Sequence, residues 1–215
     1  AYNVADGSYN VAIGEEAMKS TGTAADNHPS YNVAIGNQAG YNLTTGDNNV
    51  FLGSRAGYAS TTTQGNVAIG YEAGRYLVTA AGQTAVGYQA AKSMVDGHSN
   101  TAFGYQALTS EVASDESTAI GYKALTNQSG STTTLGNTAV GHLAGRDTTT
   151  AYRNTYVGKS AALSVTTGQQ NTALGWNALQ YVTNGISNTA VGSMAGSQVS
   201  GSSTVSYTHL RAHET

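Results

Sequence analysis

Hydrophobic and polar positions alternate over a five-residue phrase that returns along most of the chain. The phrase reads Asn-(Thr/Val)-Ala-(Ile/Val)-Gly. Alternation at period two with β-branched residues predicts a short β-strand in each copy. The closing glycine recurs at Gly14, Gly36, Gly53, Gly70, Gly87, Gly104, Gly121, Gly141, Gly158, Gly175 and Gly192. Eight of the ten intervals are 17 residues and the other two are 22 and 20, and such a short, nearly constant period is typical of a solenoid.

The two faces of the expected strand differ in side-chain size. Counting from the phrase glycine, position −1 is always large and apolar, and position −3 is Val in the first four copies and Thr from Thr84 to Thr189. Position −2 is Ala in nine copies, with Phe51 and Tyr156 as the exceptions. We therefore expect positions −1 and −3 to point into the coil, and the Ala face to point outward, toward another layer or another chain.

The rest of each coil is predicted from small and polar residues. Position +3 is Ala in all eleven copies, and most other positions are Thr, Ser, Gly, Asn or Asp, which are turn residues. A strand plus a helix needs about 20–29 residues per repeat in leucine-rich proteins. A period of 17 residues therefore favours two short strands and two turns per coil.

An asparagine opens nine of the eleven phrases, and Gln83 and Ser117 replace it in the other two. Stacked amides form hydrogen-bonded ladders in cross-β assemblies, so we expect a ladder at one corner of the coils. A carbohydrate or ion site is the alternative interpretation. The ladder is favoured because a binding site seldom needs every coil.

Composition excludes several classes of function. Nine Lys and Arg against twelve Asp and Glu give a net charge of −3, which argues against nucleic-acid binding because that needs clustered positive charge. The sequence has neither a signal-peptide pattern nor an apolar run long enough for a transmembrane helix, and we expect no membrane insertion in this stretch. It has no cysteine, so a disulfide framework is excluded.

Each coil carries little apolar area to offset the entropy of ordering 17 residues. One Ile or Val, one further Val or Thr, and two or three Ala are its main apolar groups. We therefore expect lateral association of several chains. A parallel homotrimer that shares an Ala-lined interior is the simplest arrangement.

The last eleven residues break the repeat. We expect residues 1–204 to form one repeat domain, a piece of a longer fibre, and residues 205–215 to be a non-native tail. The tail resembles one reading frame of a common transposase sequencing adapter over its whole length, which implies a gene assembled from environmental DNA. His209 and His213 have the four-residue spacing of zinc ligands on a helix, beside Glu214, but the adapter origin favours no metal site.

Two forms of the repeat resemble known families. The phrase Asn-Val-Ala-Ile-Gly at Asn10–Gly14, Asn32–Gly36 and Asn66–Gly70 resembles repeats of trimeric autotransporter adhesin heads. The longer form at Asn100–Leu108 and Asn171–Leu179 is similar to repeats of phage tail-fibre proteins. The adhesin resemblance implies left-handed parallel β-rolls assembled as trimers. Together the resemblances imply an extracellular location, on a virion tail fibre or a bacterial surface, and leave that choice open.

The resemblance covers about residues 9–203, and with the pattern it defines the expected fold and function. We expect an all-β, parallel β-solenoid of about eleven coils, left-handed and trimeric. Its expected role is the shaft of a phage tail fibre or bacterial adhesin, supporting attachment to a host or surface. No catalytic triad, nucleophile elbow, phosphate loop or calcium-binding repeat is present in the sequence, so we expect neither an enzyme nor a cofactor.

An aromatic row is the main ligand candidate. It consists of position +1 in six coils: Tyr71, Tyr88, Tyr105, Tyr122, His142 and Trp176. Exposed rings at a regular rise could bind the sugar rings of a host glycan. The alternative, which we favour, is a stack that packs coil on coil.

The loops of the two longer coils are further candidates for ligand contact, and ice binding is an alternative activity. The long intervals insert loops, and insertions in solenoids often mark a binding face, so a glycan or protein receptor could contact Asn27, His28, Ser131 and Thr132. Ice binding would require the Thr row at position −3 to face outward on a flat surface. Val11, Val33, Val50 and Val67 fill that position in the early coils, which favours a core position and disfavours ice binding.

Overall fold

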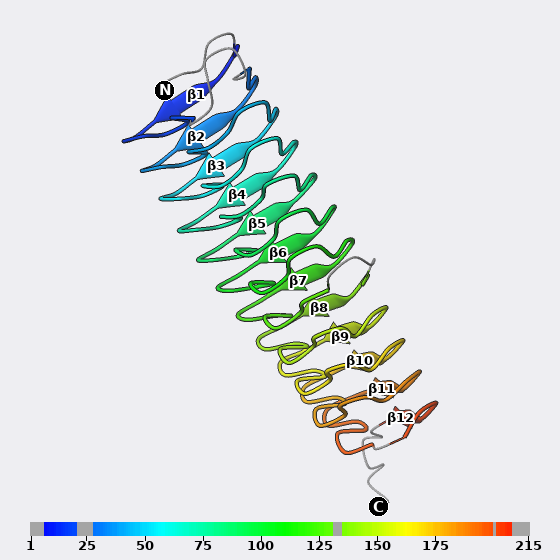
Figure 1. Cartoon of the computed structure of the whole chain (residues 1–215). Coiled ribbons are helices and arrows are strands. Elements are labelled where there is room, and N and C mark those ends of the chain that lie inside the picture. Colours follow the sequence, from blue (N-terminus) through cyan, green and yellow to red (C-terminus); the bar gives the residue numbers. More distant parts are fainter. Residues whose placement is uncertain (1–6, 21–27, 131–134, 200, 208–215) are drawn as a thin grey trace, which may run out of the picture.

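The fold is a parallel β-solenoid, as predicted. The computed structural model describes residues 7–20, 28–130, 135–199 and 201–207. Twelve three-residue strands pair in chain order in one parallel sheet. They are β1 (Val11–Ile13), β2 (Val33–Ile35), β3 (Val50–Leu52), β4 (Val67–Ile69), β5 (Thr84–Val86), β6 (Thr101–Phe103), β7 (Thr118–Ile120), β8 (Thr138–Val140), β9 (Thr155–Val157), β10 (Thr172–Leu174), β11 (Thr189–Val191) and β12 (Val205–Tyr207). Figure 1 shows the strands stacked along one side of a rod, with the chain turning back on either side of them.

Equivalent phrase positions pair with one another along the whole sheet. Val50 pairs with Val67, and Thr118 pairs with Thr138 across the 20-residue interval. The longer coils therefore add their extra residues outside the strands. β12 continues the ladder three residues past the boundary expected at residue 204, pairing Thr189 with Val205, since a parallel edge bonds through backbone groups that any extended segment offers.

Each described coil has one named strand, not the two that its length suggested. After the phrase glycine the chain forms a run of turns. The Ala at position +3 closes the first of them, with its N–H donating to the carbonyl of the phrase glycine, as in Ala90 to Gly87 at 3.3 Å. Hydrogen bonds to the neighbouring coils continue through these turns, for example Gln89 N to Tyr71 O at 2.9 Å.

The predicted direction of the strand side chains is wrong. Position −2 lies inside the coil: Ala34, Phe51 and Tyr156 are fully buried. Position −1 lies on the outside, where Ile13 is 56% and Phe103 is 54% exposed. The interior of a 17-residue coil is too thin for large side chains from both walls, so Ala fills it. The Ala residues therefore cannot line an interior shared between chains.

Where an aromatic residue replaces the Ala at position −2, its ring lies against a glycine at position +4, which also faces the core. A Cβ added to Gly57 would lie 2.5 Å from the ring of Phe51, and one added to Gly145 would lie 2.7 Å from the ring of Tyr156. Six other coils carry a larger side chain at this position +4, such as the fully buried Leu108, and three further coils have Gly there together with Ala at position −2. The glycines thus make room for the two aromatic rings.

This exchange gives a stability prediction. Replacing Phe51 by Ala should lower the free energy of unfolding by about 3 kcal/mol, because it leaves a cavity opposite Gly57. Gly57→Ala alone should also destabilise the fold, because its Cβ meets the ring. The double variant should be more stable than the sum of the two losses predicts, measured by urea unfolding followed by circular dichroism. Strict additivity would contradict the proposed exchange.

Candidate functional site

The asparagine row is a structural ladder, as predicted. Asn49 donates from its backbone N and from Nδ2 to Oδ1 of Asn32, at 2.9 and 3.0 Å, and Nδ2 also donates to the carbonyl of Thr63 at 2.9 Å. Asn66 in turn donates twice to Oδ1 of Asn49. Both lone-pair positions and both amide hydrogens of Asn49 are therefore used within the protein. A sugar or ion would find no free capacity there.

The ladder crosses the Ser117 coil with help from a neighbouring residue. The Ser117 side chain is too short to reach the next asparagine. Gln128 is fully buried and donates to Oγ of Ser117 at 2.9 Å and of Ser114 at 3.2 Å, while its Oε1 accepts from Nδ2 of Asn137 at 2.9 Å. One glutamine thus replaces the missing amide and keeps this polar row satisfied.

Loss of one amide from the ladder should be costly. Asn154 accepts two bonds from Asn171 and donates to Asn137 and to the carbonyl of Gly168. Asn154→Ala should lower the free energy of unfolding by about 2 kcal/mol, because it leaves buried polar groups without partners. Asn184→Ala, at an exposed turn position, should change it by less than about 0.5 kcal/mol. Urea unfolding of both variants checks this, and equal losses would contradict it.

The aromatic row forms a continuous stack over five coils. Ring centroids are 5.4 Å apart for Tyr71 and Tyr88, 5.0 Å for Tyr88 and Tyr105, 5.3 Å for Tyr105 and Tyr122, and 4.9 Å for Tyr122 and His142. The planes lie within 8–15° of one another. Each inner ring therefore covers the faces of its neighbours and offers a ligand only its edge. This geometry favours coil-to-coil packing over sugar stacking.

The remaining candidates do not join this stack. Lys159 occupies position +1 after the coil of His142, so Trp176 lies one coil further on; it is 48% exposed. His28 is exposed. The other loop candidates, Asn27, Ser131 and Thr132, lie outside the described residues, as does the tail with His209 and His213. Within the described parts of the chain, no group of three or more His, Asp or Glu is placed to hold a metal ion.

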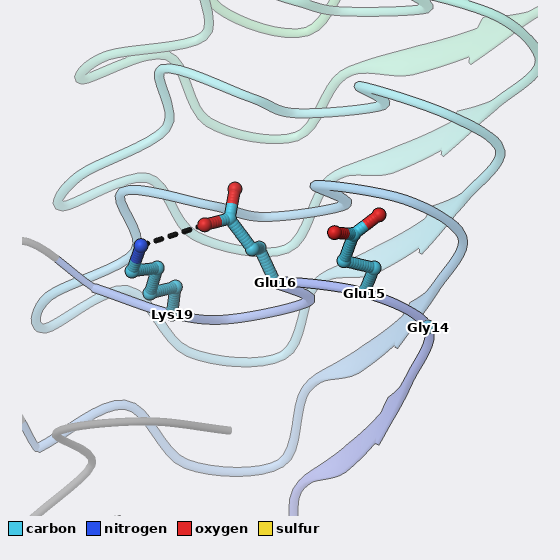
Figure 2. Close-up of a pocket in the computed structure, with 4 residues that line it drawn as sticks. All are labelled: Gly14, Glu15, Glu16 and Lys19. Atoms are coloured by element: carbon cyan, nitrogen blue, oxygen red, sulfur yellow. Dashed lines mark hydrogen bonds and ion pairs between the residues drawn. The ribbon is translucent and has the colours of Figure 1, made fainter.

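A hollow beside the first described coil is lined by charged residues, but these pair with one another. Figure 2 shows Glu16 turned toward Lys19, with Oε1 and Nζ 2.6 Å apart, and Glu15 standing apart from this pair. Hydrogen bonds from Gln38 and Lys19 lower the pKa of Glu16, and Glu15 accepts from Asn37 at 3.1 Å. Both glutamates follow Gly14 in a turn. Their pairing does not resemble an acid–base couple.

The outer face of the sheet is the surface that sequence reasoning missed. Positions −1 and −3 form two rows along it, and we call them together the sheet face. The −1 row is Ile13, Ile35, Leu52, Ile69, Val86, Phe103, Ile120, Val140, Val157, Leu174 and Val191; the −3 row is Val11, Val33, Val50, Val67, Thr84, Thr101, Thr118, Thr138, Thr155, Thr172 and Thr189. At about 4.8 Å per strand the rows extend roughly 50 Å. Large contiguous exposed apolar patches often mark interaction surfaces.

Comparison with protein-family models, curated proteins and solved structures finds no match to this chain. No helix in the described residues is long and apolar enough to cross a membrane.

A sequence signal for the sheet face did exist. The two aromatic residues that replace Ala each have a glycine at position +4 beside them, Gly57 in the coil of Phe51 and Gly145 in the coil before that of Tyr156. Three further coils have glycine there with Ala at position −2, and the pairing agrees with position −2 being inside. The sheet face then has to be outside, because neighbouring strand residues point in opposite directions. It presents one row of large apolar side chains and a second row with a threonine hydroxyl in seven of the strands.

Proposed function

We propose that this chain is the shaft of an extracellular fibre, from a phage tail or a bacterial adhesin, and that three parallel copies associate through the sheet face. The observation that carries this proposal is the unbroken row of apolar side chains at position −1. Ile69, Phe103 and Leu174 are 36%, 54% and 45% exposed in the single chain. The shaft itself is non-catalytic and supports attachment to a host or surface.

Three sheet faces turned toward a common axis would bury both rows in every copy. Burial of apolar area is the main favourable term in such association. The coils are equivalent along the rod, so one rotation places every coil of one copy beside the same coil of the next. Closed cyclic symmetry of this kind is usual for homo-oligomers. Compared with the expectation from sequence, Ile, Val and Thr line the shared interior in place of Ala.

Sedimentation equilibrium of the purified chain tests the assembly. The expected mass is three times the 21.9 kDa of one chain, with the circular dichroism spectrum of a β protein. A folded species of 21.9 kDa at micromolar concentration would overturn the proposed trimer.

Ice binding is a second candidate that a specific observation favours. The threonines at position −3 face outward in seven successive strands, β5 to β11, contrary to the prediction that placed them inside. Seven regularly spaced hydroxyls and methyls on a parallel sheet are the arrangement that ice binding would need. The exposed Phe103 side chain is larger than the aliphatic side chains of the −1 row. It interrupts the flat surface that ice binding would require, and this favours self-association. A thermal-hysteresis measurement decides between them, and absence of hysteresis would exclude ice binding.

A further inference from the structure

We propose that opposite charges on the two sides of the sheet set the register of neighbouring copies, so that Lys123 of one copy pairs with Glu116 and Asp115 of the next. The partner is a second copy of this chain, and the inference rests on the proposed trimer. We call positions +1 to +6 the glycine edge, and the four residues before each phrase asparagine or its replacement the asparagine edge. These edges flank the strands on either side (Figure 1).

The two edges carry opposite net charge. Over the described residues, the glycine edge has seven basic residues and four acidic ones. The basic residues are Lys19, Arg55, Arg75, Lys92, Lys123, Arg146 and Lys159; the acidic ones are Glu15, Glu16, Glu72 and Asp147. Over the described residues, the asparagine edge has four acidic residues and one basic one. The acidic residues are Asp47, Asp96, Asp115 and Glu116; the basic one is Arg153.

Three of the four acids of the glycine edge, Glu16, Glu72 and Asp147, are already in ion pairs. Glu72 is nearly buried and lies 2.6 Å from Arg75 and 2.8 Å from Lys92. Desolvation alone would raise its pKa, but hydrogen bonds from Lys92 and Gln89 together with these charges lower it. Asp147 pairs with Arg146 at 2.6 Å. The positive charges of this edge therefore exceed what its own carboxylates neutralise.

Lys123 is free to pair with another chain. Within the described chain it forms no ion pair, and its Nζ lies 5.5 Å from the ring centre of Tyr122. Glu116 is exposed and likewise has no ion pair there, while Asp115 uses Oδ1 to accept the His98 N–H at 2.6 Å. Opposite charges that remain accessible on both edges are what a contact between copies needs.

The register without axial offset gives Lys123 the most acidic partners. Asp115, Glu116 and Lys123 all belong to the coil of Gly121. In a parallel ring without axial offset, the glycine edge of each coil faces the asparagine edge of the same coil in the next copy. Shifting one copy by a coil would leave Lys123 opposite a single acid, Asp96 of the Gly104 coil, or opposite the uncharged Leu135 and Gly136.

The charges of the Gly53 coil agree with this register, and those of the Gly158 coil provide a test of it. Asp47 and Arg55 occupy the two edges of the Gly53 coil, with opposite charge. Arg153 and Lys159 occupy the edges of the Gly158 coil with like charge, and the arrangement therefore predicts repulsion there.

An acidic polysaccharide could also bind the basic edge. A second copy is favoured because it supplies the complementary charge at the same coil, as ring-forming interfaces require.

Charge-reversal variants test the inference by sedimentation equilibrium at low and at 0.3 M salt. Lys123→Glu and Glu116→Lys should each raise the trimer dissociation constant at least tenfold at low salt, and the combined variant should restore it to within about threefold. Arg153→Glu should tighten assembly, because it turns repulsion of Lys159 into attraction. All three positions have φ between 52° and 60°, so the swaps do not add backbone strain, and circular dichroism should stay unchanged.

The outcomes separate the two proposals. If wild type is trimeric and the charge variants assemble equally well, the register mechanism is wrong while the trimer stands. If Lys123→Glu loses affinity for heparin but assembles normally, the glycine edge is a ligand surface and the inference is overturned. A monomeric wild-type chain would remove the trimer itself.

Discussion

Replacing Gly104 by alanine should lower the free energy of unfolding by about 3–5 kcal/mol, because the added Cβ has no room and the backbone conformation is unsuitable. Gly104 has φ +139°, and its Cβ would lie 2.4 Å from the carbonyl oxygen of Gly121 in the next coil. The clash is with backbone, which cannot move without breaking the ladder on both sides. Urea unfolding followed by circular dichroism measures the loss.

Gly82→Ala is the matched control for this substitution. Gly82 also has a positive φ, +66°, but its Cβ would meet nothing closer than 3.8 Å. The equivalent position one coil later is Ser99 with φ 56°, so a side chain is tolerated there. The expected loss is about 1 kcal/mol, from left-handed strain alone. Equal losses for the two variants would show that close coil contact is not the reason for the phrase glycine.

The period, the parallel solenoid and the asparagine ladder could be predicted because each rests on repetition. A ladder of amides needs one amide per coil at one position, and the sequence displays this from Asn32 to Asn188 in every coil except that of Ser117. The stacking of Tyr88 on Tyr105 follows in the same way. Residues that recur at one phase must lie above one another in any solenoid, whatever the shape of its coil.

The inside and outside of the coil could not be read from repetition. Alternation places position −2 on one face of the strand and positions −1 and −3 on the other. It does not say which of these two faces points into the coil, toward the turns on its opposite side. The usual rule that large apolar residues are buried fails for this strand, because the opposite wall already supplies large side chains such as Leu108 and Leu125, and the strand exposes Ile120 instead. This error also hid the outward threonines, and with them the geometric case for ice binding.

The shape of the turns was equally inaccessible to sequence reasoning. Position +2 adopts a left-handed backbone in every described coil although it is occupied by residues such as Glu72, Lys123 and Leu143, with φ of 53°, 52° and 59°. No local preference predicts this conformation for them. The turn is imposed by hydrogen bonds to adjacent coils, such as Lys123 N to Tyr105 O at 2.8 Å. The two charged edges depend on the same turn geometry and emerge only from the structure.

Replacing Ile120 by glutamate should abolish assembly without unfolding the chain. Ile120 is 38% exposed at the centre of the sheet face, so the fold of one copy does not depend on its burial. In the proposed trimer, however, three carboxylates would meet near the axis, where like-charge contact costs several kcal/mol. We expect the trimer dissociation constant to rise by roughly 10³-fold, measured by sedimentation equilibrium.

Val112→Glu is the control for this variant, because Val112 is 42% exposed but lies outside the strands, eight residues after Gly104 and away from the sheet face. It should leave the assembly unchanged. The two readouts test separate statements. An unfolded Ile120→Glu chain would contradict the outward orientation of position −1, whereas a folded and still trimeric one would contradict association through the sheet face. A folded monomer would support both statements. The single chain accepts the glutamate only if position −1 points outward, and the trimer is lost only if this position is buried between copies.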